Sequence, residues 1–425
     1  MMKKWKFILG AMSPLAALPL IVASCTNKTT SNESIEDIKK KLEDNISQLS
    51  KEQKLDLINK IDINQTLDAD QKAELISKFN SGAGIVASIV WFMNSAEARI
   101  AQIQAYQLAT IAFDNLKKKA ANDKMDYSAL NSDGTVKNPE TGKFVPVVFM
   151  DIDETIFVNE YTESWSVVEN GGRFSEDKKD SIDAIGKRRA IPGSIDFINH
   201  VFKEGGIVMF NSGIRQLRPS IDGIKKNLIS AGIDKKYIQD WMFWTSGVNP
   251  LKEDGKTYDP TPWITGTKNS ASEVDKNFWK VTSKNQRMNG VSDNPNGWDF
   301  SKSQAGSGNA VKTRVIMKIG DDFNDFFDDA YKSERNNAKN IEFFKKPEIE
   351  KLFKDVTGAT GIKVVKEKNS KEIKIENLAW HQFNLQVPGN AMYGGWSSGY
   401  GYANYKKLWD ALKQINQNSN DNKVQ

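Results

Sequence analysis

Apolar and polar positions follow different patterns in successive parts of the chain. An apolar run from about residue 7 to residue 23 comes after a basic start. Residues 35–79 are rich in charge, with Ile and Leu at helical spacing, which predicts a spacer of short helices. Residues 83–121 predict one long amphipathic helix with a single apolar stripe, which we expect to face a core. The stripe consists of Phe92, Ala96, Ile100, Ile103, Tyr106, Ala109, Phe113 and Leu116.

Short apolar runs further along the chain predict buried strands of a parallel sheet. These runs occupy residues 147–150, 206–210 and 315–319. Each run ends in polar residues, and helical sequence separates the runs from one another. The pattern therefore predicts a doubly wound α/β sheet, whose ligands bind beyond the carboxyl edge of the strands.

Carboxylates follow two of these strands. Asp151 and Asp153 are separated by one residue, and Asp321 and Asp325 follow the later strand. Gly320, just before them, permits close backbone approach. Burying several carboxylates requires a cation or a shared proton, and Mg²⁺ is the natural partner of an all-oxygen site. One aspartate of such a site can act as nucleophile while another exchanges protons.

The middle strand ends in Asn211 and Ser212. A hydroxyl beside backbone amides at the carboxyl end of a strand can hold a phosphoryl oxygen. Taken alone this signal is weak, because Asn-Ser-Gly also forms turns. Together with the acidic strand ends, it indicates a phosphate-binding edge.

Composition narrows the chemistry further. Apolar residues make up 39% of the 425 residues and charged residues 27%, so the chain can bury a core. One cysteine excludes an internal disulfide, and two histidines, His200 and His381, exclude a three-histidine zinc site. The net charge of +5 includes Lys3, Lys4 and Lys6 at the start, and the remainder carries only +2. This balance gives no reason to expect a nucleic-acid polymer as partner.

Residues 1–25 have the order of a secretory signal peptide: a basic start, an apolar run and small residues. Pro14 and Pro19 argue against a stable membrane-spanning helix. The segment Val-Ala-Ser-Cys that ends at Cys25 resembles the lipobox of bacterial lipoproteins, in which the cysteine carries acyl chains. This predicts lipid anchoring on the extracellular face of the bacterial cell membrane. The alternative is an ordinary signal peptide that ends near a cysteine by chance.

These patterns give an expected domain order. Residues 1–25 form the signal segment, and residues 26–82 form a flexible tether and helical stalk. Residues 83–415 form the catalytic domain, with an insertion at about 246–310, and residues 416–425 form a polar tail.

The motifs, taken in order, resemble the haloacid dehalogenase superfamily of phosphohydrolases. More narrowly, they resemble its class C acid phosphatases, which are bacterial surface lipoproteins. The matching segments are WFMNSAEARIAQIQAY, VVFMDIDETIFVN, KRRAIPGSIDFINHV, FNSGIR, IGDDFNDF and VPGNAMYGGW. The resemblance spans about residues 88–412 and implies a haloacid dehalogenase-like, Rossmann-like parallel sheet with a small, mostly helical cap.

The resemblance also implies roles for individual residues. Asp151 would be the nucleophile that forms an aspartyl-phosphate, and Asp153 would be the general acid and then the base. Mg²⁺ would be held by Asp151, the main-chain carbonyl of Asp153 and Asp321, with support from Asp325. Ser212 would bind the phosphoryl group.

The third motif of the family is a phosphate-binding lysine, and here the sequence offers alternatives. Lys284 fits the family's Lys-x-x-Arg pattern, because Arg287 follows three residues later. Lys312 is the second candidate, because it lies nearer the fourth motif.

Further departures concern the substrate. Tyr393 matches one of the two aromatic residues between which the family stacks a nucleotide base. The expected cap tryptophan falls in a non-aromatic stretch, residues 178–182, and Trp165 is the possible substitute. Asp322 stands where the family usually has Asn and adds a negative charge beside the metal.

The sequence thus predicts a surface-anchored, Mg²⁺-dependent acid phosphatase that hydrolyses phosphate monoesters, with 5′-nucleotides as candidate substrates. One alternative is a catalytically weak lipoprotein that binds a ligand or a host surface on the same fold. Another is a different haloacid dehalogenase reaction, such as phosphoryl transfer between sugars.

Overall fold

The computed structural model describes most of the region that the motifs occupy. The described residues are 83–170, 174–246, 283–293, 297–300, 304–305, 310–334, 337–366, 372–390 and 405–421. The predicted signal segment, Cys25, the stalk and Tyr393 lie outside these residues. Residues 84–403 form one compact unit, and the C-terminal helix belongs to a second unit and is described by itself.

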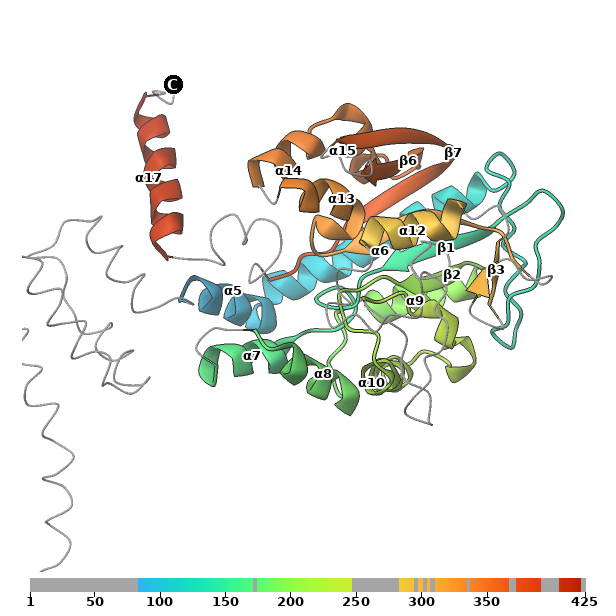
Figure 1. Cartoon of the computed structure of the whole chain (residues 1–425), viewed down its shortest axis with the longest axis horizontal. Coiled ribbons are helices and arrows are strands. Elements are labelled where there is room, and N and C mark those ends of the chain that lie inside the picture. Colours follow the sequence, from blue (N-terminus) through green and yellow to red (C-terminus); the bar gives the residue numbers. More distant parts are fainter. Residues whose placement is uncertain are drawn as a thin grey trace, which may run out of the picture. The chain divides into compact units, whose positions relative to one another are not determined.

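A five-stranded sheet in the order β2-β1-β5-β7-β6 lies at the centre of the larger unit (Figure 1). Its strands are β1 (Val145–Met150), β2 (Ile207–Phe210), β5 (Thr313–Gly320), β6 (Ala359–Lys366) and β7 (Ile373–Gln386). The first three coincide with the apolar runs of the sequence. β2, β1, β5 and β7 run parallel, whereas β6 pairs antiparallel with β7 at the edge.

Helices surround this sheet, so its central strands are buried. The helices that contact it include α6 (Ala96–Lys118), α9 (Ser194–Lys203), α12 (Lys284–Asp293), α13 (Asn324–Glu334) and α15 (Pro347–Lys354). In Figure 1, α12 and α13 lie above β1 and α9 lies below it. Every residue of β1 and β2 is buried, as a parallel strand covered on both faces requires. The expected doubly wound α/β fold is confirmed.

The expected single helix over residues 83–121 is wrong, because the chain forms two helices. α5 (Ala83–Asn94) and α6 are separated at Ser95, whose backbone is extended. The Ser95 hydroxyl accepts a hydrogen bond from the amide of Ala98 at 3.1 Å. Ser95 is thus the N-cap of α6, and Glu97 in the first turn complements the helix dipole.

The expected apolar stripe of this region is also partly wrong. Ile100 is 53% exposed and Ile103 is 42% exposed. The buried face of α6 includes Gln102, whose side-chain amide donates to the carbonyl of Pro388 at 3.4 Å. The helix therefore turns a partly polar face inward, because it contacts loops of the site as well as the apolar core.

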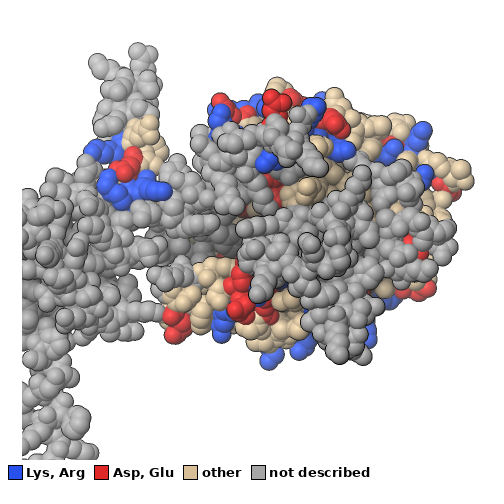
Figure 2. All heavy atoms as spheres, viewed as in Figure 1, with Lys and Arg blue, Asp and Glu red and all other residues tan. Residues whose placement is uncertain are grey.

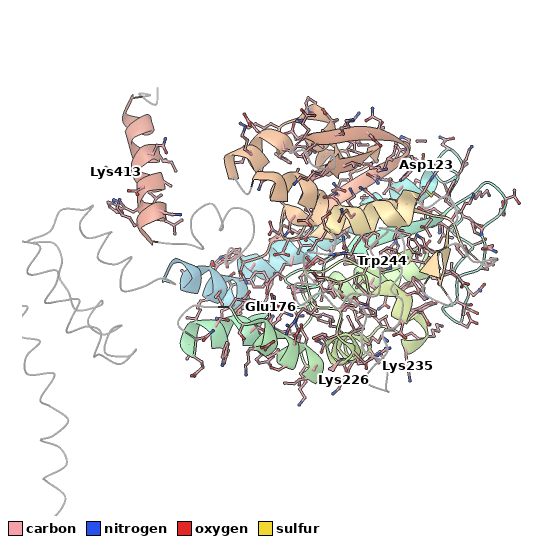
Figure 3. The ribbon with its side chains drawn as sticks, in the orientation of Figure 1. Asp123, Glu176, Lys226, Lys235, Trp244 and Lys413 are labelled. Atoms are coloured by element: carbon pink, nitrogen blue, oxygen red, sulfur yellow. The ribbon has the colours of Figure 1, made fainter. Side chains whose placement is uncertain are left out.

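Two short helices between β1 and α9 form a small helical cap. They are α7 (Glu160–Val168) and α8 (Glu176–Ile185), and Glu176 at the start of α8 is labelled in Figure 3. α10 (Arg218–Ser230) packs against α8. Gly223 makes this packing close, because a Cβ there would lie 1.9 Å from the carbonyl oxygen of Asp183.

The remaining elements are short or peripheral. They are η1 (Lys235–Tyr237), η2 (Asp240–Met242), β3 (Trp298–Asp299), β4 (Gln304–Ala305), α14 (Asn337–Phe344) and α17 (Tyr405–Asp421). Trp244, labelled in Figure 3, packs edge-on against Phe149 of β1 and against Trp298 of β3. Part of the expected 246–310 insertion therefore belongs to the core. Among the described residues, no helix combines the length and the apolar character needed to cross a membrane.

Positively and negatively charged side chains are mixed on the visible surface of the described residues. Along the upper edge of the face in Figure 2, Lys and Arg side chains alternate with Asp and Glu side chains. α17, taken by itself, exposes Leu412 at 61% and Ile415 at 64%.

Candidate active site

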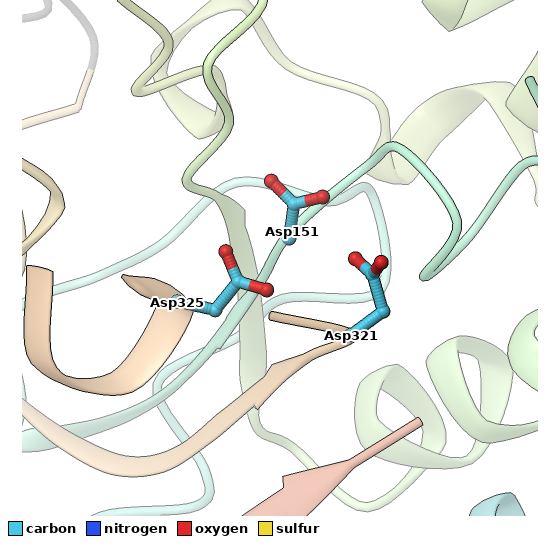
Figure 4. A group of neighbouring side chains, drawn as sticks. All are labelled: Asp151, Asp321 and Asp325. Carbon is cyan, nitrogen blue, oxygen red and sulfur yellow. The ribbon is translucent and has the colours of Figure 1, made fainter. Parts of the chain in front are cut away.

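Three carboxylates converge at the carboxyl edge of the sheet (Figure 4). Asp151 follows β1, Asp321 follows β5, and Asp325 lies in the first turn of α13. One oxygen from each lies within 4.8 Å of the others. The strand-end pattern in the sequence thus brings Asp151 and Asp321 together across two neighbouring parallel strands.

Two glycines make room for these carboxylates. A Cβ at Gly320 would lie 2.1 Å from Oδ2 of Asp325, and one at Gly389 would lie 2.5 Å from Oδ2 of Asp321. Any side chain at either position would displace a carboxylate. The close approach expected at Gly320 is therefore present, and Gly389 is its counterpart after β7.

Lys284, the first residue of α12, contributes a cation to the same group. Its ammonium contacts Oδ1 of Asp151 at 2.7 Å and also contacts Asp325. The backbone amide of Lys284 donates to Oδ2 of Asp328 at 2.7 Å, which fixes the start of the helix. Lys312 is exposed, and its carbonyl pairs with the amide of Val145 at the opposite end of β1. The structure thus brings Lys284, and not Lys312, to the carboxylates.

One lysine does not compensate three carboxylates, of which two are buried and that of Asp321 is half-buried. Burial raises the pKa of Asp151 to about 7, although Lys284 opposes this rise and Asp325 adds to it. Burial and the neighbouring Asp325 and Asp151 raise the pKa of Asp321 well above its usual range. The pKa of Lys284 is raised, because Asp151 and Asp325 outweigh the effect of its burial. The cluster has an excess of negative charge that favours a bound cation.

This donor set fits a hard divalent cation. It consists of carboxylate oxygens at a strand edge, without a nearby thiol or imidazole in the described residues. Asp322 adds negative charge beside it, and its amide donates to Oδ2 of Asp325 at 2.9 Å. The described part of the chain therefore contains a carboxylate cluster that could hold a metal ion.

Ser212 lies at the end of β2, next to β1, and is fully buried. Its hydroxyl oxygen accepts from the amide of Ile214 at 3.3 Å. Arg287 donates to the side chain of Asn211 at 2.7 Å and to the carbonyl of Ser212 at 3.1 Å. The Lys-x-x-Arg spacing therefore places Lys284 on the carboxylates and Arg287 on the turn that carries Ser212.

The side chain of Asp153 does not join the carboxylate cluster. Its Oδ1 contacts the ammonium of Lys179 at 3.0 Å and the guanidinium of Arg188 at 2.7 Å. Burial acts to raise the pKa of Asp153, but these two cations outweigh it, so the pKa is lowered. Its main-chain carbonyl remains the group through which Asp153 would support a metal, as the family resemblance implies.

The turn after Asp153 is held by helices on either side. Glu154 has a left-handed backbone (φ 56°), and its carboxylate accepts from the amide of Asn159 at 2.6 Å. Tyr106 of α6 donates to the carbonyl of Thr155 at 2.5 Å. The hydroxyl of Thr155 donates to Oδ1 of Asp321 at 3.3 Å. The loop after Asp151 is thus connected both to α6 and to the second acidic strand end.

The cap and the segment after β7 meet at a second buried carboxylate. The side-chain nitrogen of Asn390 donates to both carboxylate oxygens of Glu163 of α7, at 2.9 and 2.8 Å. Burial raises the pKa of Glu163 to about 7. Trp165, the possible stacking residue, is half-buried in α7, and the ammonium of Lys178 lies 5.4 Å from the centre of its ring.

The sequence did not assign roles to Lys179, Asp183 or Arg188. Arg188 lies within a segment that matches the family, but that segment was read only as a link from cap to core. Lys179 and Asp183 are four residues apart on α8, a spacing that is common in solvated helices. That spacing was the available signal, and it does not distinguish a buried ion pair from a surface one.

Comparisons with known proteins found one matching family and similar solved structures. Residues 80–242 match the family model of the HAD superfamily, subfamily IIIB (acid phosphatase). The match includes Asp151, Asp153 and Ser212, whereas Lys284 and Asp321 lie beyond its end. The class C acid phosphatase from Bacillus anthracis is similar with a TM-score of 0.44 and 16% identity, over 78% of this chain and 95% of that chain. The tungstate-bound structure of that enzyme gives the same TM-score and identity, over 76% of this chain and 94% of that chain.

The resemblance to the haloacid dehalogenase superfamily is therefore confirmed by the family match. Over residues 80–242 the chain matches an acid phosphatase of that superfamily, which is a phosphoric monoester hydrolase.

Proposed function

We propose that this acid phosphatase hydrolyses phosphate monoesters with Mg²⁺ through an aspartyl-phosphate on Asp151. The observation that carries the proposal is the contact of Asp151 with Lys284 inside a cluster that also includes Asp321 and Asp325. These four side chains lie at the carboxyl edge of a doubly wound sheet, where ligands of such folds bind. The presence of all four side chains at one place favours an enzyme over a catalytically weak binding protein.

In the first step, a carboxylate oxygen of Asp151 attacks phosphorus and the bond to the leaving oxygen breaks. The leaving oxygen takes a proton from the protonated form of Asp153 and departs as an alcohol. In the second step, water attacks phosphorus and gives its proton to Asp153. The bond from phosphorus to Asp151 then breaks, which releases inorganic phosphate and restores both aspartates.

Other groups stabilise the charge on the phosphoryl oxygens. Lys284 carries a fixed positive charge at 2.7 Å from Asp151, and Ser212 offers a hydroxyl at the neighbouring strand end. Mg²⁺ would be held by Asp151, Asp321, Asp325 and the carbonyl of Asp153, and would supply further neutralisation of phosphoryl charge.

The test is hydrolysis of p-nitrophenyl phosphate with and without EDTA, followed by addition of MgCl₂. We expect EDTA to abolish turnover and Mg²⁺ to restore it. Lys284→Met is expected to lower kcat by two orders of magnitude or more, since a buried charge at the phosphoryl site is lost. Lys312→Met is the matched control, because this lysine is exposed away from the carboxylates. Equal activity of the two variants would contradict the proposed role of Lys284.

The substrate class beyond a phosphate monoester is a further proposal. A panel of 5′-nucleotides, sugar phosphates and simple alkyl phosphates tests a preference for nucleotides, in which Tyr393 would stack on the base. Tyr393→Ala is expected to raise KM for a nucleotide several-fold and to leave KM for an alkyl phosphate unchanged.

We also propose that a lipid on Cys25 anchors the protein to the extracellular face of the bacterial membrane. The support is the lipobox-like segment that ends at Cys25, the only cysteine of the chain. Labelling of cells with a fatty-acid analogue is expected to mark the protein, and Cys25→Ser is expected to remain unlabelled.

A further inference from the structure

Asp153 uses one carboxylate oxygen for two cations. Its Oδ1 is buried and lies 3.0 Å from Lys179 and 2.7 Å from Arg188. The side chain as a whole keeps 19% of its surface exposed. Because both cations contact Oδ1, the other carboxylate oxygen is left for a substrate.

The two cations are themselves fixed by a fully buried carboxylate. Asp183 contacts the ammonium of Lys179 at 2.5 Å and the guanidinium of Arg188 at 3.1 Å. Arg188 also donates to the carbonyl of Phe157 at 3.0 Å and to the side chain of Asn159 at 2.6 Å. Two carboxylates and two cations therefore form a closed, charge-balanced group around Asp153.

The group is anchored to the catalytic core through α10. The carbonyl of Asp183 lies against Gly223 of α10, where a Cβ would be 1.9 Å away. Asn227 of the same helix accepts from the backbone amide of Arg188 at 3.0 Å. Lys179 and Asp183, although they belong to the cap, are thus held at a defined place relative to Asp153.

We propose that Lys179 and Asp183 are positioning residues for proton transfer by Asp153. Lys179 holds Oδ1 of Asp153, Asp183 holds Lys179, and the other oxygen of Asp153 is thereby turned toward the leaving group. The inference rests on the proposed role of Asp153 as proton donor. Neither residue needs to touch the substrate, because both act through the carboxylate of Asp153.

The proposal predicts an effect that depends on the leaving group. An alkyl phosphate releases a strongly basic oxygen and needs a proton in the transition state, whereas p-nitrophenolate departs without one. General acid catalysis contributes roughly 10²- to 10⁴-fold. The comparison uses kcat/KM, which reports the steps up to departure of the leaving group and not the later attack of water. Lys179→Met is expected to lower kcat/KM for an alkyl phosphate on the order of 10²-fold. For p-nitrophenyl phosphate, the same variant is expected to retain kcat/KM within about threefold.

The matched control is Lys178→Met, because the neighbouring Lys178 contacts the ring of Trp165 and not Asp153. It is expected to leave the ratio of the two kcat/KM values unchanged. Lys179→Arg keeps a cation within reach of Asp153 and is expected to restore most of the alkyl phosphate turnover. Equal losses of kcat/KM on both esters in Lys179→Met, or no loss on either, would overturn the proposal.

Two further variants keep the result interpretable. If Lys179→Met does not fold, as judged by its thermal unfolding, Asp183→Asn replaces it and is expected to show the same selective loss in smaller degree. Asp153→Asn is measured in parallel. Full alkyl phosphate turnover by Asp153→Asn would overturn the role of Asp153 itself. A selective loss in Asp153→Asn without one in Lys179→Met or Asp183→Asn would overturn only the positioning role.

Discussion

Two groups of charged side chains lie next to each other in this molecule and differ in net charge. The cluster of Asp151, Asp321 and Asp325 has Lys284 as its cation and keeps an excess of negative charge. The group around Asp153 pairs two carboxylates with two cations. An unbalanced cluster is costly until a cation binds, whereas a balanced one is stable alone. The first group is therefore suited to a ligand, and the second to holding one side chain in place.

The largest effect is expected at the unbalanced cluster, in catalysis. Asp151→Asn removes the attacking carboxylate, so we expect turnover of p-nitrophenyl phosphate to fall on the order of 10⁴-fold or more. The control is Asp133→Asn, an exposed aspartate in a surface turn, which is expected to keep activity within about twofold. Appreciable turnover by Asp151→Asn would remove Asp151 from its proposed role.

The balanced group should instead govern stability. Asp183→Ala leaves Lys179 and Arg188 without their shared buried partner, and breaking such a pair costs about 3–5 kcal/mol. We expect this loss in the free energy of unfolding, measured by urea denaturation. The comparison variant is Asp177→Ala at the exposed end of α8, with an expected change below about 1 kcal/mol. Similar losses in the free energy of unfolding for Asp183→Ala and Asp177→Ala would show that the buried group does not stabilise the fold more than a surface ion pair does.

A buried cation without a carboxylate partner among the described residues sharpens the comparison. Lys318 of β5 is 3% exposed, and burial lowers its pKa to about 8. Its ammonium lies 5.5 Å from the ring of Phe327, and Asn384, its partner in register on β7, has no hydrogen-bond partner for its side chain among the described residues. The unfolded chain holds a proton at pH values where folded Lys318 has lost it, so stability should rise with pH between about 8 and 10.5.

Lys318→Met should remove this dependence. Below pH 8 the variant is expected to be about 3 kcal/mol more stable than the natural protein, because a charged lysine no longer has to be buried. At pH 10.5 the difference should shrink toward zero. Urea unfolding of both proteins across this range measures the effect. A difference that does not change with pH would show that the ammonium is solvated or paired.

The smallest expected effect returns to the unbalanced cluster. Asp321→Asn removes one of three mutually repelling carboxylates, so the protein in EDTA should gain about 1–2 kcal/mol. Excess MgCl₂ should stabilise the natural protein by about 2–3 kcal/mol at a hundredfold excess over Kd, and should stabilise the variant little. Thermal unfolding in EDTA and in MgCl₂ separates the two contributions. A loss of stability in EDTA would contradict the proposed repulsion.

The sequence predicted the parts of the site that follow strands. Asp151 and Asp321 were found because apolar runs end in carboxylates, and parallel strands bring such ends to one edge. Lys284 came from the family resemblance, because its distance along the chain from Asp151 carries no geometric information. The metal cluster could thus be predicted as a set of residue types, but the contact of Lys284 with two of its members required the structure.

The group around Asp153 could not be predicted in the same way. Lys179 and Asp183 follow an ordinary helical spacing, and their burial depends on the approach of α10 at Gly223. The break at Ser95 was missed for a related reason, since the apolar pattern continues across it. The N-cap at Ser95 decides where α6 begins, and the spacing of apolar residues carries no information about a cap.

α6 sets a limit on how far the chain can be shortened. Its side chains touch the nucleophile loop through Tyr106 and the segment after β7 through Gln102. Tyr106 also lies against Gly193, where a Cβ would be 2.9 Å from it. Truncation that removes residues before Ser95 spares these contacts, whereas truncation into α6 would release the loop next to Asp151. The minimal active fragment must therefore begin upstream of Ala96, well before the first residue of the sheet.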